Sequence, residues 1–280
     1  MRDNSKRLSA VQDTAAVASV GDSALGLEFP VPTELVDLPS RGKHYSAGHP
    51  LHEQETIEIR FMTAKDEDIL ASPSLLKKGL AIDRFLQNVV VDKRINIASL
   101  LSGDKSAIIV ASRINGFGAE YTTSMTCPSC ASSTQASFNL DEIKTYLGDD
   151  YQDYEISETD IGTHTITLPK SRFEVEVRLL TGKDATALLS PPKGSTSSPG
   201  ETSLTDLIKR IVTSINGVTD RKLLDRAIDV MPARDSRYLR AAYIRVIPGL
   251  DMTQEFCCPS CGLEKEVDIP LTVDFFWSNK

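Results

Sequence analysis

The sequence has no surplus of basic residues, and this absence limits the partners that it can have. Its 31 Lys and Arg residues are outnumbered by 39 Asp and Glu residues, which gives a formal net charge of -8. A protein that binds nucleic acid or an anionic membrane normally presents a basic face. We therefore expect neither nucleic acid nor a membrane as a partner.

Long apolar runs are also missing. No segment approaches the roughly 20 apolar residues that a membrane-spanning helix needs. The beginning of the chain, MRDNSKRLSAVQDTAAVASV, has no continuous apolar core of the kind found in secretion signals. We therefore expect a reducing cytoplasm, in which paired cysteines bind metal more often than they form disulfides.

Catalytic signatures are absent as well. The sequence contains no GxGxxG fingerprint, P-loop, HExxH or GxSxG motif. His44, His49 and His52 crowd a turn-rich segment, but their spacing fits no helical metal-binding pair, so we expect a surface loop there. The chain is predicted not to be an enzyme, and an unrecognised catalytic site is the alternative.

What the sequence does contain is a cysteine motif that occurs twice. CPSC covers residues 127–130 and again residues 258–261. Cys-x-x-Cys places two thiols on one tight turn, and the proline restricts the backbone of that turn. A tetrahedral zinc ion needs four such ligands, which two turns on separate β-hairpins can supply, as in zinc ribbons. The predicted ligands are Cys127, Cys130, Cys258 and Cys261.

The same cysteines allow other interpretations. Iron can occupy a site of four thiolates, and disulfides could join the two turns. Zinc is favoured because nothing else in the sequence suggests electron transfer and because a cytoplasm disfavours disulfides. A closed site of four thiolates leaves no position for substrate, so this zinc is predicted to be structural. The fifth cysteine, Cys257, is interpreted as a small apolar filler.

The cysteine turns belong to a longer passage that is written twice. IEIRFMTAKDEDIL starts at residue 57, and FEVEVRLLTGKDATALL starts at residue 173. Each passage reads as a strand with alternating apolar residues, followed by a helix that begins at a threonine with an aspartate three residues later. Both halves continue with a helix, a glycine-bearing turn, a strand, the CPSC turn and another strand. We predict an α+β fold of two tandem pseudo-repeats that share one zinc-ribbon-like site.

These patterns divide the chain into parts. The predicted parts are a flexible N-terminal tail (1–25), an extended, turn-rich arm (26–55), the first repeat (56–145), an acidic connection (146–171) and the second repeat (172–280). Residues 190–203 of the second repeat are rich in Pro, Gly and Ser and are predicted to be a surface loop. A tail and an arm of this kind can become ordered on neighbouring subunits.

An aromatic group lies near the end of the sequence. Phe275, Phe276 and Trp277 could close the core of the second repeat, or they could anchor the chain in a protein interface. The first repeat has no matching group, which favours a special role. These three residues are therefore candidate partner-binding residues.

Two stretches of the chain resemble the base plate protein family of T-even contractile-tailed phages, which is assigned to the baseplate hub. They are FMTAKDEDILASPSLLKKGLAIDRFLQNVVVDKRINIASLLSGDKSAIIVASRINGFGAEYTTSMTCPSC and FCCPSCGLEKEVDIPLTVDFFW. The resemblance implies a structural or assembly role without catalysis, and other hub and tail proteins as partners. It also implies a location in the virion tail baseplate and, during assembly, in the host cytoplasm. The family's cysteine pairs map onto the four predicted zinc ligands.

A zinc-ribbon accessory protein that binds nucleic acid is the alternative function. Zinc ribbons often serve that purpose, but the acidic balance and the lack of a stretch that combines Arg or Lys with aromatic residues speak against it.

Overall fold

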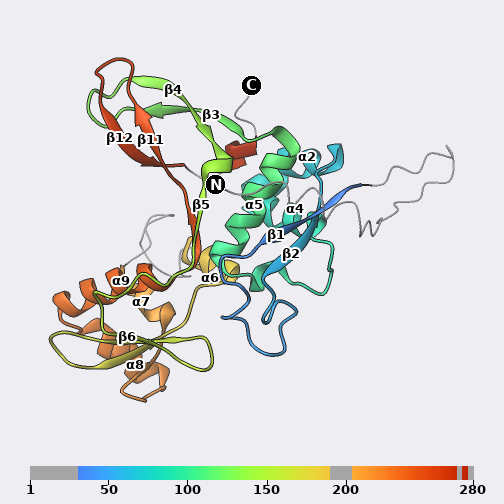
Figure 1. Ribbon diagram of the computed structural model, residues 1–280. Helices are drawn as coiled ribbons and strands as arrows, with labels where there is room; N and C mark the ends of the chain where they lie inside the picture. Colours follow the sequence, from blue (N-terminus) through green and yellow to red (C-terminus); the bar gives the residue numbers. More distant parts are fainter. Residues whose placement is uncertain (1–30, 190–203, 270–272, 277–280) are drawn as a thin grey trace.

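The computed structural model describes residues 31–189, 204–269 and 273–276. The chain folds into helices and small antiparallel sheets (Figure 1), which confirms the α+β fold class. The predicted tail at 1–25 and the predicted loop at 190–203 lie outside the described residues. None of the helices within these ranges combines the length and the apolar composition that crossing a membrane would require.

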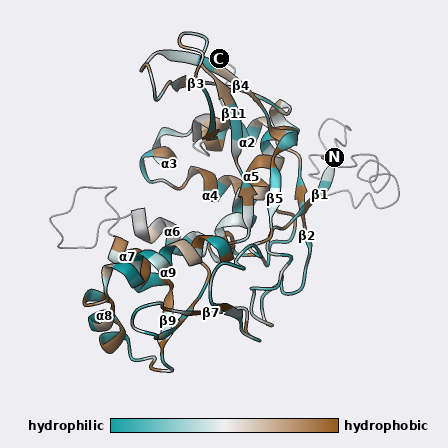
Figure 2. Cartoon of the chain, turned by 60° about the vertical axis from the view of Figure 1, so that its left-hand side comes forward, coloured by the Kyte–Doolittle hydropathy of each residue, from teal (hydrophilic) through white to brown (hydrophobic). Residues whose placement is uncertain are grey.

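The first half of the chain is built around helix α5 (Ser102–Phe117), which buries Ile108 and Val110. Figure 2 shows hydrophobic residues on this helix and on α4. The elements before α5 are β1 (Thr33–Asp37), β2 (Thr56–Arg60), α2 (Ala64–Ala71), α3 (Pro73–Lys77), α4 (Ala81–Val89) and the 3-10 helix η1 (Ile97–Ser99). β1 and β2 pair antiparallel, and α4 buries Phe85, Leu86 and Val89. The first half therefore has a helical core with a two-stranded ladder beside it.

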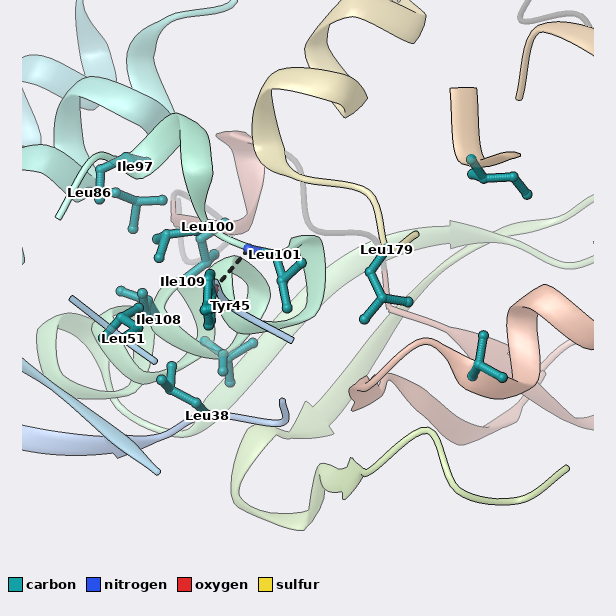
Figure 3. Packing of buried hydrophobic residues seen from close by; sticks show 14 of the residues in the cluster. Leu38, Tyr45, Leu51, Leu86, Ile97, Leu100, Leu101, Ile108, Ile109 and Leu179 are labelled. Atoms are coloured by element: carbon teal, nitrogen blue, oxygen red, sulfur yellow. Dashed lines mark hydrogen bonds between the residues drawn. The ribbon is translucent and has the colours of Figure 1, made fainter. Parts of the chain in front are cut away.

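Residues 38–55 form turns between β1 and β2 and pack onto this core. Leu38, Tyr45 and Leu51 are buried, and Tyr45 lies beside Leu101 (Figure 3). The Tyr45 hydroxyl accepts a hydrogen bond from the backbone N–H of Leu101 at 3.0 Å. Within the described part of the predicted arm, β1 and the turns at 38–55 pack against the first half of the chain.

The second half is built around a four-stranded antiparallel sheet in the order β6-β7-β8-β9. Its elements are β6 (Ile156–Glu158), β7 (His164–Thr167), β8 (Glu174–Val177), α6 (Gly182–Leu189), α7 (Leu204–Ile211), β9 (Val212–Ile215), α8 (Arg221–Asp229) and α9 (Ala233–Val246). β6 and β7 fall within residues 146–171, which the sequence analysis described as an acidic connection. They form half of the sheet instead, and Ile166 on β7 is fully buried.

Two β-hairpins lie side by side at one end of the molecule (Figure 1). β3 (Glu120–Thr126) pairs with β4 (Ser133–Asn139), and β11 (Thr253–Cys257) pairs with β12 (Glu264–Asp268). Each hairpin joins two strands through one CPSC turn.

Beyond its hairpin, each half of the chain crosses to the other half. After the first hairpin and the 3-10 helix η2 (Leu140–Glu142), β5 (Lys144–Tyr146) pairs with β10 (Gly249–Asp251) of the second half. After the second hairpin, the 3-10 helix η3 (Val273–Phe276) packs against α5 of the first half. The buried apolar residues of both halves accordingly form one core.

Candidate metal centre

The two CPSC turns have the same backbone hydrogen bonds. In the first turn, the N–H of Cys127 donates to the carbonyl of Ser132 at 2.9 Å, and the Cys127 carbonyl accepts from Ala131 at 2.9 Å. In the second turn, Cys258 makes the equivalent bonds, and the one to its carbonyl from Gly262 is 2.8 Å long. Ala131 and Gly262 both have a positive φ, of 56° and 70°. The two turns therefore present their cysteines in the same local geometry.

The four sulfur atoms meet between the hairpins. All four Sγ atoms lie within 4.8 Å of one another. The Sγ atoms of Cys127 and Cys261 are 3.7 Å apart, and those of Cys130 and Cys258 are 3.8 Å apart. A tetrahedron with zinc–sulfur bonds of about 2.3 Å has an edge of about 3.8 Å. A disulfide needs sulfurs about 2.05 Å apart, so the sequence-predicted cysteines come together as free thiols, in an arrangement that could hold a metal ion.

Two of the four cysteines belong to a small apolar cluster between the hairpins. Cys127 and Cys258 are buried together with Phe256, whereas Cys130 and Cys261 are exposed. The apolar residues packed around this cluster are Met125, Ala136, Leu263 and Val267. The cluster is small compared with the main core, so the hairpins have few apolar contacts of their own to hold them together.

The hydroxyl of Ser132 adjusts the electrostatics of the site. Its Oγ lies 3.0 Å from the Sγ of Cys130 and 3.6 Å from the Sγ of Cys258. Hydrogen bonding by Ser132 lowers the pKa of the Cys130 thiol and lowers the pKa of the Cys258 thiol to about 6. Thiolate is the form that binds a metal ion. The sequence analysis missed Ser132, and the repeat gives no signal for it, because Leu263 occupies the matching position in the second turn.

The arrangement limits the chemistry that the site can perform. With four thiolates on one ion, no ligand position stays open for water or substrate. A group occupied in this way would fasten one hairpin to the other and would offer no position at which a metal could activate a nucleophile.

Cys257 does not belong to this group. The side chain is exposed, so its interpretation as a small apolar filler is wrong. It precedes the buried Cys258 on strand β11, and neighbouring residues of a strand point to opposite faces.

The structure places Phe275 and Phe276 in the core. They are 0% and 1% exposed, and their rings lie 4.9 Å from that of Tyr121 and 5.3 Å from that of Phe85, between ring centroids. These contacts are with the first half, whereas the sequence analysis expected either a partner interface or the core of the second half. Trp277 lies outside the described residues.

Arg113 is a further residue that sequence reasoning missed. Its guanidinium is buried on α5 and donates hydrogen bonds to the carbonyls of Phe275, Gly118 and Glu120 at 3.1, 2.8 and 3.2 Å. Burial lowers the pKa of this side chain. Arg113 thereby ties η3 to the end of α5 and the start of β3.

Comparison with known protein families identifies one family that matches the chain. A family model described as T4 bacteriophage base plate protein matches residues 32–277. Searches of curated proteins and of solved structures found no match. The match spans both hairpins and nearly all of the described residues, and it confirms the resemblance drawn from the sequence. The chain therefore belongs to the T4 bacteriophage base plate protein family.

Proposed function

We propose that the chain is a structural or assembly component of the phage tail baseplate, located at its hub, and that it binds neighbouring baseplate and tail proteins. The observation that carries this proposal is the family match over residues 32–277. The chain works in the virion tail, and it reaches the tail from the host cytoplasm during assembly. No catalytic role is part of the proposal.

The four cysteines hold a structural zinc ion in this proposal. The spacing of the sulfurs fits a tetrahedral ion, and such a set of ligands suits zinc or iron. Zinc is the better choice because a hub component has no use for electron transfer. The ion supplies the cohesion that the small apolar cluster between the hairpins lacks.

The two halves are tandem pseudo-repeats in this proposal, and one line of support is a repeated ion pair. Arg60 donates two hydrogen bonds to Asp66, and Arg178 donates two to Asp184. Each aspartate lies in the first turn of its helix, and each also accepts from the backbone N–H and the hydroxyl of a threonine three residues earlier. These donors match between the two halves, whereas the further partners differ: Asn88 donates to Asp66, and Arg210 donates to Asp184.

A second buried aspartate supports the same relationship. Asp104 lies in the first turn of α5 and accepts hydrogen bonds from the backbone N–H and the hydroxyl of Ser40 at 3.0 and 2.6 Å. Asp235 lies in the first turn of α9 and accepts from the backbone N–H groups of Lys170 and Ser171, both at 2.9 Å. Both donor segments follow a Leu-Pro pair, and the spacing from aspartate to CPSC turn is the same in both halves.

In this proposal, the zinc ion holds the two pseudo-repeats in a fixed relative position. The site joins equivalent turns, and the chain exchanges segments between the halves on either side of it. A metal ion at this point fixes one half relative to the other and hence the relative placement of the surfaces that neighbouring subunits contact.

Quantitative peptide mass spectrometry of purified mature particles tests the proposal, with the copy number scaled to the tail tube protein. We expect a small, fixed number of copies per particle. Absence from particles, together with presence in assembly intermediates, would identify an assembly factor that leaves. Absence from both would overturn the baseplate function.

A pair of variants tests the part that zinc plays in assembly. Cys127→Ser combined with Cys130→Ser should prevent tail formation, because the hairpins lose half of their metal ligands. Cys257→Ser is the matched control and should assemble normally. Normal tails from the double variant would contradict the zinc role while leaving the baseplate assignment intact.

A further inference from the structure

A second group of potential metal ligands lies far from the cysteines in the sequence. One ring nitrogen each of His44 and His164 and a carboxylate oxygen of Glu158 lie within 4.8 Å of one another. The three residues come from the turns at 38–55, from β6 and from β7. The group therefore joins the first half of the chain to the sheet of the second half.

Strand register brings two of these side chains together. Glu158 and His164 are directly opposite each other at the end of the β6–β7 ladder. Residues opposite each other in an antiparallel pair project from the same face of the sheet, with their Cβ atoms about 5 Å apart. Glu158 is exposed at the edge, whereas His164 is 2% exposed.

His44 is held in place by the turn between these strands. Its Nδ1 lies 3.0 Å from the carbonyl oxygen of Gly162. Gly162 has a φ of 76°, and a Cβ at this position would lie 3.1 Å from the Cα of His44. The close approach leaves His44 with its ring centroid 5.4 Å from that of His164.

The hydrogen bond to Gly162 prepares His44 for a metal. An imidazole that donates Nδ1–H to a backbone carbonyl keeps the lone pair of Nε2 free, and metal-binding histidines usually have such a second partner. The tight turn thereby fixes the tautomer as well as the position of the ring.

The hydrogen bonding of His164 is a second, independent observation that points to a ligand. Its Nδ1 is buried and has no hydrogen-bond partner among the described residues. Buried polar groups nearly always have a partner, so an unpaired nitrogen on a ring that belongs to this group needs an explanation.

We propose that His44, Glu158 and His164 bind a divalent transition-metal ion of the zinc class and so fasten the 38–55 segment to the β6–β7 hairpin. Two imidazoles and one carboxylate are a ligand set that zinc accepts, with water in the fourth position. The exposed side of Glu158 leaves room for that water. The site is separate from the cysteine centre and does not depend on it.

Metal counting on the full-length chain tests the proposal, with a preparation that carries no histidine tag. The protein is dialysed against Zn²⁺ and its bound metal is measured by mass spectrometry. We expect one equivalent beyond that held by the cysteines. Co²⁺ substitution then separates the two sites, because cobalt on nitrogen and oxygen ligands lacks the charge-transfer band of cobalt on thiolates.

Variants at the exposed ligand positions show which residues are responsible. Glu158→Gln and His44→Gln should each lower the affinity for the additional metal ion by at least about tenfold. Neither residue is in the buried core, so both variants should fold. His52→Gln is the matched control, since His52 lies in the same segment, outside the cluster, with its Nδ1 2.7 Å from the carbonyl oxygen of Tyr45. It should retain the additional equivalent.

Two results would overturn the proposal. One is wild-type protein that binds no metal beyond the cysteine-bound equivalent at saturating Zn²⁺. The other is an additional equivalent that persists with unchanged affinity in both Glu158→Gln and His44→Gln, because such binding would reside elsewhere.

Discussion

Arg60 and Asp66 form a bidentate ion pair, with Nη1 2.7 Å from Oδ2 and Nη2 2.8 Å from Oδ1. The Asp66 side chain is fully buried, and it also accepts hydrogen bonds from Thr63 and Asn88. Burial raises the pKa of Asp66, but these hydrogen bonds outweigh burial and lower it. The pair connects strand β2 to the first turn of α2.

Asp66→Asn should therefore destabilise the protein strongly. Removal of one partner from a buried ion pair leaves an uncompensated charge and costs about 3 kcal/mol. The corresponding Asp184→Asn variant should lose less, because the Arg178 side chain is 36% exposed against 19% for Arg60. Urea unfolding of both variants measures the two losses. A loss for Asp184→Asn equal to or above that for Asp66→Asn would contradict this order.

The Arg178–Asp184 pair should also make stability depend on pH. Hydrogen bonds from Arg178 hold the pKa of Asp184 well below its usual range. The unfolded chain takes up a proton near its ordinary pKa of about 3.9, where the folded protein does not. The stabilisation is thus complete above that pH and is lost as the pH falls below it. In unfolding experiments, the difference between wild type and Asp184→Asn should shrink below about pH 4, and a difference independent of pH would refute the expectation.

The local features of this fold could be predicted from the sequence. The threonine and aspartate that begin α2 and α6 are three residues apart, and the cysteines of each turn are three residues apart, so chain geometry alone brings them together. The family resemblance rests on the same passages.

Apart from the meeting of the two CPSC turns, contacts between distant segments could not be predicted from the sequence. Ser40 and Tyr45 lie in a turn-rich stretch whose pattern gives no sign that both bind Asp104. β6 and β7 were not predicted because the sequence around them is acidic and because both strands are short, with only a few buried residues such as Ile166. The local pattern around Phe276 likewise does not reveal that it packs against Phe85, because that partner is in the other half.

Gly103 should be intolerant of any side chain. A Cβ at this position would lie 2.0 Å from the carbonyl oxygen of Pro248, where α5 meets the chain just before β10. Gly103→Ala forces the two halves apart and should cost about 1–3 kcal/mol. Gly48→Ala is the control, since nothing lies within 4 Å of its added Cβ, and it should change stability by less than about 0.5 kcal/mol. Equal melting temperatures for the two variants would contradict this prediction, because they would show that the contact between Gly103 and Pro248 can open without loss of stability.

Removal of metal should lower the melting temperature of the purified protein. The hairpins share little apolar surface, so their association should depend on the ion that we propose between the cysteines. Elemental analysis should find zinc in reduced protein, and a strong chelator should remove it and reduce the melting temperature. Cys257→Ser should retain the metal and respond to chelator as wild type does. Reduced protein that carries no metal, with a melting temperature unaffected by chelator, would eliminate the cysteine centre.

Phe276 should contribute to the stability of the first half despite its position near the end of the chain. Its ring is 1% exposed and makes an edge-on contact with Phe85. Truncation of a buried phenylalanine to alanine costs about 3–5 kcal/mol, so Phe276→Ala should lower the free energy of unfolding by that amount. Phe173→Ala is the matched control, because Phe173 is 42% exposed and its loss should cost less than about 1 kcal/mol. A Phe276→Ala protein of normal stability that fails to enter particles would instead assign this residue to a partner interface.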